Sequence, residues 1–148
     1  MNAQPLRLPA DLAGRLLAIA RAREPGEGCG LLLGSPSGAT HLVEVANVSP
    51  DLGRFEAHPG QWRAAIDAAR ERDEAVVAAW HSHVAGAAVP GLRDSLSHWG
   101  RLPVLLVAPA GRPPLRAWRR GAGGWCECLL QIEEYPAEEA PTPAASAP

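Results

Sequence analysis

The sequence has too few cysteines for a disulfide framework and no apolar stretch long enough for a membrane span. Its 148 residues include three cysteines, an odd number, so reduced thiols are the simpler interpretation. No apolar run approaches the roughly 18 residues of a spanning helix, and the N-terminus MNAQPLRLP lacks the basic-then-apolar order of a signal peptide. These absences predict a cytoplasmic protein without a membrane partner.

A strong charge of either sign is also missing. The formal net charge is -2, and the arginines are scattered along the chain. Domains that bind nucleic acid usually carry a basic patch or stripe that neutralises phosphates. We therefore expect no nucleic-acid partner.

The length is that of one domain, which can bury a core of its own. We predict a single domain over residues 1–135. The remaining stretch, 136–148, is rich in Pro, Ala and Glu and has almost no large apolar residue. Burial cannot offset the entropy of ordering such a segment, so we predict that this tail is disordered.

Apolar periodicity and turn residues predict a mixed α+β sandwich around one sheet. Helices are expected where apolar residues recur every three or four positions, and strands where short apolar runs are bounded by turn residues. The predicted helices cover 9–23, 59–69 and 92–99, and the predicted strands cover 29–33, 42–45, 76–80, 103–107, 115–118 and 125–132. By position, the tryptophans are mostly core candidates: Trp62, Trp80, Trp99, Trp118 and Trp125.

The pattern His81-Ser82-His83 follows directly after the apolar run 76–80. Alternate side chains of an extended backbone face the same way, so both imidazoles project from one side while Ser82 points away. A catalytic zinc takes three nitrogen, sulfur or carboxylate ligands and keeps a fourth position for water. The pattern supplies two such ligands, although an isolated H-x-H at a strand end is more often a pair of partly exposed histidines.

Asp94 is the nearest carboxylate able to close such a site. The Gly, Ala and Pro residues of segment 84–91 can turn the chain back, and Asp94 then falls in the first turns of the predicted third helix. We predict Asp94 as the third ligand. A helix N-cap or a first-turn acid favoured by the helix dipole is its alternative role. His98 and the charged run near Asp73 are worse-placed ligands.

Cys126 and Cys128 lie two residues apart, which puts them on one face of a strand. A lone C-x-C lacks the second pair of a zinc ribbon. We interpret both as ordinary core or surface thiols, with a metal or redox role as the alternative.

Several stretches taken together resemble the JAMM or MPN+ family (Mov34/JAB) of zinc metallopeptidases, in its bacterial single-domain type. The family's pattern is a glutamate, then H-[ST]-H, then a spaced aspartate. The matching pieces are Pro25-Gly26-Glu27-Gly28-Cys29-Gly30, Asn47 through Phe55 to Pro59, the run 76–83 with its two histidines, and Asp94. The resemblance covers nearly all of the chain before the tail.

The resemblance implies a cytidine-deaminase-like JAB/MPN fold, in which a mixed sheet is flanked by about three helices. It implies that His81, His83 and Asp94 bind Zn²⁺ and that Glu27 is the general base that activates the zinc-bound water. Judged on the residues alone, Glu27 would be a surface turn acid.

Two positions depart from the family pattern. Gly91 stands where the family usually has a serine that supports the negatively charged intermediate, and losing one such donor costs roughly 10²- to 10³-fold in rate. Val84 replaces the proline that normally follows H-x-H, which should loosen or redirect the loop. Neither departure removes a zinc ligand.

The activity implied by the resemblance is hydrolysis of a peptide or isopeptide bond near the C-terminal Gly-Gly of a ubiquitin-like or sulfur-carrier protein. An extended tail can dock by adding a strand to a sheet edge, and Gly-Gly passes a narrow cleft. The alternative is a binding or scaffold module of the same fold with weak or no catalysis, to which Gly91 points. Hydrolysis of cell-wall or phage peptides fits less well, because no signal peptide is visible.

Overall fold

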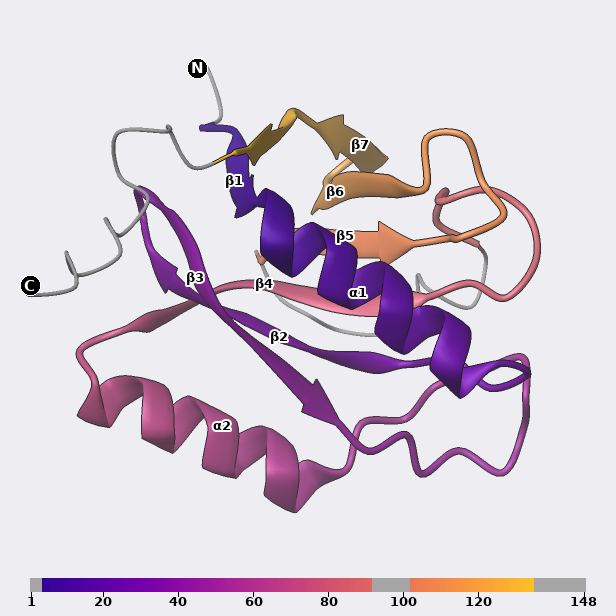
Figure 1. Ribbon diagram of the computed structural model, residues 1–148, viewed down its shortest axis with the longest axis horizontal. Coiled ribbons are helices and arrows are strands. Elements are labelled where there is room, and N and C mark those ends of the chain that lie inside the picture. Colours follow the sequence, from indigo (N-terminus) through magenta and orange to yellow (C-terminus); the bar gives the residue numbers. More distant parts are fainter. Residues whose placement is uncertain (1–3, 92–101, 135–148) are drawn as a thin grey trace, which may run out of the picture.

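The computed structural model describes residues 4–91 and 102–134 of the chain (Figure 1). Within these ranges the elements are β1 (Leu6–Pro9), α1 (Ala10–Arg23), β2 (Cys29–Ser35), β3 (Gly38–Val45), α2 (Pro59–Glu71), β4 (Ala75–Ser82), β5 (Val104–Val107), β6 (Leu115–Gly121), β7 (Gly124–Cys128) and β8 (Leu130–Glu133). Neither helix in these ranges is long and apolar enough to cross a membrane.

The strands form two sheets of unequal size. Six strands form the main sheet in the order β3-β2-β4-β5-β6-β7, and β1 and β8 form a separate parallel pair. In the main sheet only the β4–β5 pair is parallel, and the other neighbours are antiparallel. The strand that leads into the H-x-H pattern, β4, is therefore one member of the parallel pair.

The two helices cover opposite faces of the main sheet, because alternate strand residues point to opposite sides. Even-numbered residues of β2 and β4, such as Leu32 and Trp80, pack in the core cluster that contains Leu12 and Leu16 of α1. Odd-numbered residues of the same strands pack against α2: Leu31, Leu33 and Ala79 contact Ala65 and Ala69. Figure 1 shows α1 lying across the sheet in front of the central strands.

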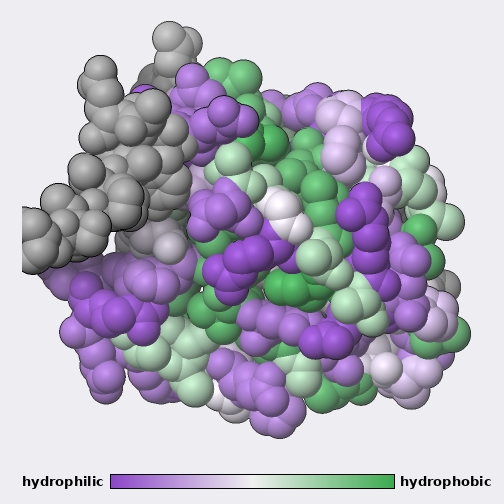
Figure 2. All heavy atoms as spheres, in the orientation of Figure 1, coloured by the Kyte–Doolittle hydropathy of each residue, from purple (hydrophilic) through white to green (hydrophobic). Residues whose placement is uncertain are grey.

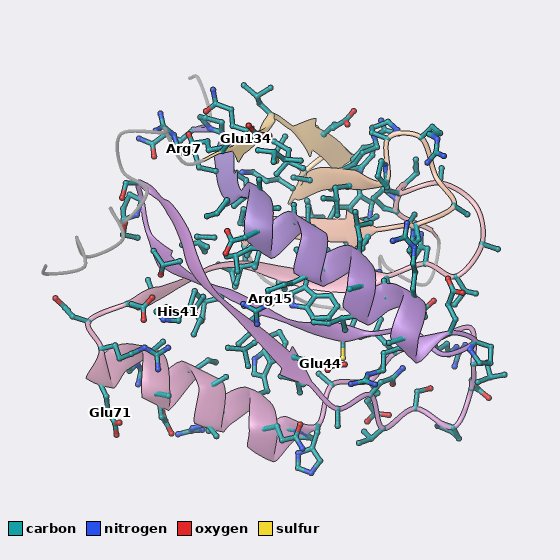
Figure 3. All side chains as sticks on the ribbon, viewed as in Figure 1. Arg7, Arg15, His41, Glu44, Glu71 and Glu134 are labelled. Atoms are coloured by element: carbon teal, nitrogen blue, oxygen red, sulfur yellow. The ribbon has the colours of Figure 1, made fainter. Side chains whose placement is uncertain are left out.

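Both helices begin at a proline, which cannot donate a backbone hydrogen bond and so suits a helix start. Pro9 is the N-cap of α1, and Pro59 lies at the start of α2, where the Nδ1 atom of His58 accepts a hydrogen bond of 3.1 Å from the Gln61 N–H. The outward faces of the helices are polar. Glu71 of α2 points away from the sheet (Figure 3), and hydrophilic residues cover much of the face over α1 (Figure 2).

A close crossing of Trp80 over Gly30 ties the three strands β3, β2 and β4 together. Trp80 in β4 is fully buried, and its indole N–H donates a hydrogen bond of 3.2 Å to the carbonyl of Val43 in β3. The ring passes over Gly30 in β2, where an added Cβ would lie 1.9 Å from the Val43 carbonyl oxygen and 2.8 Å from the indole nitrogen. Glycine is therefore required at position 30 because no side chain fits there, and not because of an unusual backbone conformation.

The mixed α+β class, the first two predicted helices and the predicted strands before residue 119 are confirmed. The prediction of one last strand over 125–132 is wrong, because the chain leaves the main sheet after Cys128 and β8 pairs with β1. The same pairing shows two further errors of the sequence prediction: it missed β1, and it expected one sheet where the structure has two. The predicted third helix at 92–99 and the predicted tail at 136–148 lie outside the described residues.

Candidate functional site

The paired ends of β2 and β4 hold the segment that carries Glu27 against the one that carries His81 and His83. Cys29 pairs with His81 in antiparallel register. The pairing continues one step further, because the Ser82 N–H donates a hydrogen bond of 2.9 Å to the Gly28 carbonyl. Glu27 directly precedes Gly28 and His83 directly follows Ser82, so both predicted site residues flank this junction.

His81 and His83 lie on one side of β4, as the sequence predicts. Their ring centroids are 5.3 Å apart, and the ring planes are inclined by 52°. Because alternate residues share a face, this is the side on which α2 packs, and Cys29, the partner of His81, belongs to the same side. His81 is only 1% exposed, whereas His83 is half-buried.

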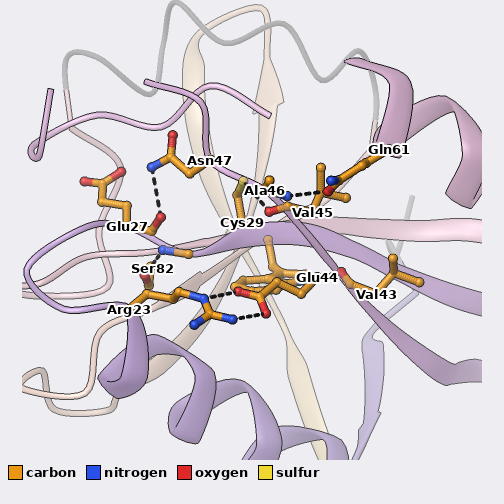
Figure 4. Close-up of polar contacts among 12 residues, drawn as sticks. Arg23, Glu27, Cys29, Val43, Glu44, Val45, Ala46, Asn47, Gln61 and Ser82 are labelled. Carbon is orange, nitrogen blue, oxygen red and sulfur yellow. Dashed lines mark hydrogen bonds and ion pairs between the residues drawn. The ribbon is translucent and has the colours of Figure 1, made fainter. Parts of the chain in front are cut away.

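Ser82 points to the opposite face, which agrees with the sequence prediction. Its hydroxyl makes a hydrogen bond there. Its Oγ accepts a hydrogen bond of 2.7 Å from the buried Gly28 N–H (Figure 4). Together with the backbone bond in the other direction, this contact fixes the segment that carries Glu27 against the strand that carries both histidines. Ser82 therefore links the two halves of the candidate site.

Replacing Ser82 with Ala would leave the Gly28 N–H buried without its acceptor. A buried unsatisfied donor costs about 1–3 kcal/mol, so we expect Ser82→Ala to lower the free energy of unfolding by that amount in urea titrations. Ser35→Ala is the matched control, since the hydroxyl of Ser35 bonds Ser37 on the exposed surface. Equal losses for the two variants would show that the Ser82 contact has no special role.

Phe55 covers the inner histidine. Its ring stacks on His81 with centroids 4.2 Å apart and an angle of 23° between the planes. Phe55 is the only phenylalanine of the chain and comes from the segment between β3 and α2. Stacking restricts rotation of the imidazole and keeps water from one of its faces.

Asn47 holds the segment that carries Phe55. Its amide group makes four hydrogen bonds to the backbone: Nδ2 donates to the carbonyls of Glu27 (2.9 Å) and Arg54 (3.1 Å), and Oδ1 accepts from the N–H groups of Ser49 (3.0 Å) and Glu56 (2.9 Å). Figure 4 shows the bond that reaches Glu27. One side chain thus fixes both the covering segment and the residue predicted to be the general base.

His83 is oriented by a backbone carbonyl. Its Nδ1 lies 3.1 Å from the Ala87 carbonyl oxygen, which can only accept, so the neutral ring carries its proton on Nδ1 and its lone pair on Nε2. Metal-binding histidines commonly donate their second ring nitrogen to a carbonyl in this way. Two imidazoles on one face, one of them so oriented, fit the donor set that zinc takes.

The third predicted ligand cannot be placed, because Asp94 lies outside the described residues, as do Ser95 and His98. Among residues 4–91 and 102–134, no group of three or more His, Cys, Asp and Glu side chains is close enough to hold a metal ion. Of the predicted site residues, the described part of the chain contains Glu27, His81 and His83.

Cys29 shares the face of the histidines but is not a thiolate. Burial, followed by the negative charges of Glu44 and Glu27, raises the pKa of its thiol to about 12. The neutral S–H group donates to the Val45 carbonyl over 3.4 Å. A neutral thiol with this partner is a packing residue at ordinary pH.

A cleft of about 570 Å³ opens beside Glu27. It extends along the end of β3 and is lined by residues that include Arg23, Glu27, Glu44, Asn47, Asp51 and Leu52. Arg23 bonds both carboxylate oxygens of Glu44 (2.5 and 2.7 Å; Figure 4), and this pairing raises the pKa of the guanidinium. Leu52 is 63% exposed at the cleft, so an apolar side chain is presented next to the polar wall.

The sequence and the fold agree with one known family. Residues 9–121 match the family described as prokaryotic homologs of the JAB domain. The chain belongs to this family. The resemblance of the glutamate, H-[ST]-H and aspartate pattern to JAB/MPN proteins is thereby confirmed at the level of family and fold, and no curated protein sequence gives a significant match.

Solved structures share the fold of this JAB domain. A protein from Desulfitobacterium hafniense superposes with a TM-score of 0.78 at 21% identity, covering 90% of this chain and 97% of its own. A protein from Salinibacter ruber gives 0.63 at 26% identity, with coverage of 91% and 95%. A JAB1/MPN domain protein from Archaeoglobus fulgidus gives 0.60 at 19% identity, with coverage of 88% and 100%.

Proposed function

We propose that this JAB domain is a zinc-dependent metallopeptidase. His81, His83 and Asp94 would hold the zinc, and Glu27 would act as the general base. The observation that supports the proposal most is the junction of β2 and β4: Cys29 pairs with His81, and two hydrogen bonds join Gly28 to Ser82, so the segment that carries Glu27 is held against the strand end that carries both imidazoles. The JAB/MPN family includes metallopeptidases, so the proposed activity is one that the fold already accommodates.

Glu27 has the chemistry that such a reaction requires. When bound, the zinc would polarise the scissile carbonyl and lower the pKa of its water toward roughly 7. The Glu27 carboxylate then accepts a proton from the attacking water and delivers it to the leaving amine. Asn47 holds the backbone carbonyl of Glu27, and Ser82 holds the next residue, so the carboxylate starts from a fixed position.

The proposed substrate is the tail of a ubiquitin-like or sulfur-carrier protein that ends in Gly-Gly and is extended by an amide-linked group. The cleft next to Glu27 has room for an extended peptide, and its wall includes the end of the edge strand β3. Pairing with an edge strand is a common way to bind an extended peptide. Glycines at the scissile bond would pass close to Phe55 and the loop after His83 without a side chain in the way.

The first test is the metal content of protein purified without chelator, measured by elemental analysis. We expect about one zinc per wild-type chain, as in other catalytic sites with one metal. His83→Ala should lose it. His41→Ala is the matched control, because His41 is an exposed residue of β3 that bonds Glu74. A wild-type protein that takes up no zinc even when zinc is supplied would overturn the proposal.

A further inference from the structure

Two consecutive carbonyls in the loop after β4 are held from opposite directions. The Ala87 carbonyl faces Nδ1 of His83 at 3.1 Å, and the Ala88 carbonyl accepts a hydrogen bond of 2.9 Å from the indole N–H of Trp118 in β6. One carbonyl therefore touches a histidine of the candidate metal site, and the next is fixed to the sheet. The two contacts are made by adjacent residues.

The loop itself has little intrinsic stiffness. Between His83 and Ala88 it consists of Val84, Ala85, Gly86 with a φ of 88°, and Ala87. Glycine costs more conformational entropy to fix than any other residue. External contacts must therefore set the position of the Ala87 carbonyl that His83 uses.

Trp118 is well placed to provide such a contact because it is itself held on both sides. It packs against a buried cluster of Ala88, Val104, Leu106 and Ala108. The guanidinium of Arg116 lies over its ring, 4.9 Å from the centroid, and bonds both carboxylate oxygens of Glu127 at 2.7 Å. A continuous series of contacts thus runs from β7 through Arg116 and Trp118 to the loop and His83.

We propose that Trp118 is a positioning residue for the metal site, which orients His83 by fixing the Ala88 carbonyl and, through it, the Ala87 carbonyl. The proposal rests on the proposed function, since it concerns a zinc ligand of that site. Loss of the indole N–H would free the loop and let the His83 ring change its tautomer and direction. Mutating a group that orients a metal-binding histidine typically lowers metal affinity about 10- to 100-fold. We expect a loss at the lower end of this range, because Trp118 acts on His83 through the loop backbone and not directly.

The test compares Trp118→Phe with Trp125→Phe. Phenylalanine keeps an aromatic ring at position 118 but removes the N–H, whereas Trp125 packs against the same apolar cluster from β7. Zinc affinity is measured by competition with a chelator of known affinity, and the stability of the metal-free protein by urea unfolding. We expect roughly tenfold weaker zinc binding for Trp118→Phe and a change of less than about twofold for Trp125→Phe.

Arg116→Gln is a second and milder variant, which loosens Trp118 without removing its indole. It should weaken zinc binding less than Trp118→Phe does, and in the same direction. Unchanged zinc affinity in Trp118→Phe, or equal losses in Trp118→Phe and Trp125→Phe, would overturn the proposal and leave only a packing role.

A measurement on metal-free protein separates this inference from the proposed function. Nitrogen NMR of the His83 ring should report a proton on Nδ1 in wild type and a mixture of tautomers in Trp118→Phe. If wild type binds no zinc, the proposed function fails, while the NMR comparison still decides whether Trp118 orients His83. An identical His83 tautomer in both proteins would count against the positioning role.

Discussion

Glu27→Gln is expected to lower the hydrolysis rate of a Gly-Gly-extended carrier by about 10²- to 10⁴-fold, the usual contribution of a general acid–base group. Glutamine keeps the size of the side chain but cannot accept the proton of the attacking water. Because the two histidines are unchanged, the variant should retain its zinc. The measurements are kcat/KM on the extended carrier and metal content by elemental analysis.

The matched control for this prediction is Glu24→Gln. Glu24 is an exposed residue at the end of α1, three positions before Glu27, and the substitution removes the same charge. It should leave both rate and zinc content near those of wild type. A Glu27→Gln variant with undiminished turnover would contradict the role given to Glu27. A wild-type protein that holds zinc but cleaves no carrier at high enzyme concentration would favour a binding module.

Gly30→Ala is expected to destabilise the domain by about 3 kcal/mol, at the upper end of the usual cost of overpacking. The added methyl would lie 1.9 Å from the Val43 carbonyl oxygen, which is backbone and cannot simply rotate away. Either β3 must separate from β2, or the indole of Trp80 must give up its bond to Val43. Urea unfolding at neutral pH measures the loss directly.

Gly14→Ala is the opposite case and serves as the control. Gly14 is an exposed residue of α1, and a Cβ there would have no heavy atom within 4 Å outside the helix backbone and its chain neighbours. Alanine in a helix interior is favoured over glycine by roughly 0.5–1 kcal/mol, so this variant should become more stable by that amount. Destabilisation of similar size in both variants would contradict the steric explanation for Gly30.

The sequence correctly predicted the directions of His81, Ser82 and His83, because these depend on strand geometry alone. An alternating strand puts His81 and His83 on one side and Ser82 on the other whatever surrounds them. The contacts of Phe55, Asn47 and Trp118 could not be predicted in this way. They join positions far apart in the chain, and the register of β2, β4 and β6 that brings them together depends on the whole sheet.

The fold was predictable to a similar degree. Apolar spacing located α1 and α2 to within about two residues, and short apolar runs located the strands before residue 119. The β1 strand has only four residues and too little pattern to be recognised. The division of 125–132 into β7 and β8 follows from where β1 lies, and nothing in the local sequence encodes that position.

The parallel pairing of β1 with β8 also constrains the order of events as the chain is made. Leu6 pairs with Leu130 and Leu8 with Ile132, so β1 has no strand partner in its two-stranded sheet until β8 has been synthesised. Pairings so distant in sequence close slowly, because a long loop must be ordered first. Leu8, fully buried in the finished domain, therefore lacks that partner until then, and a nascent chain arrested before residue 130 would expose part of the core to chaperones.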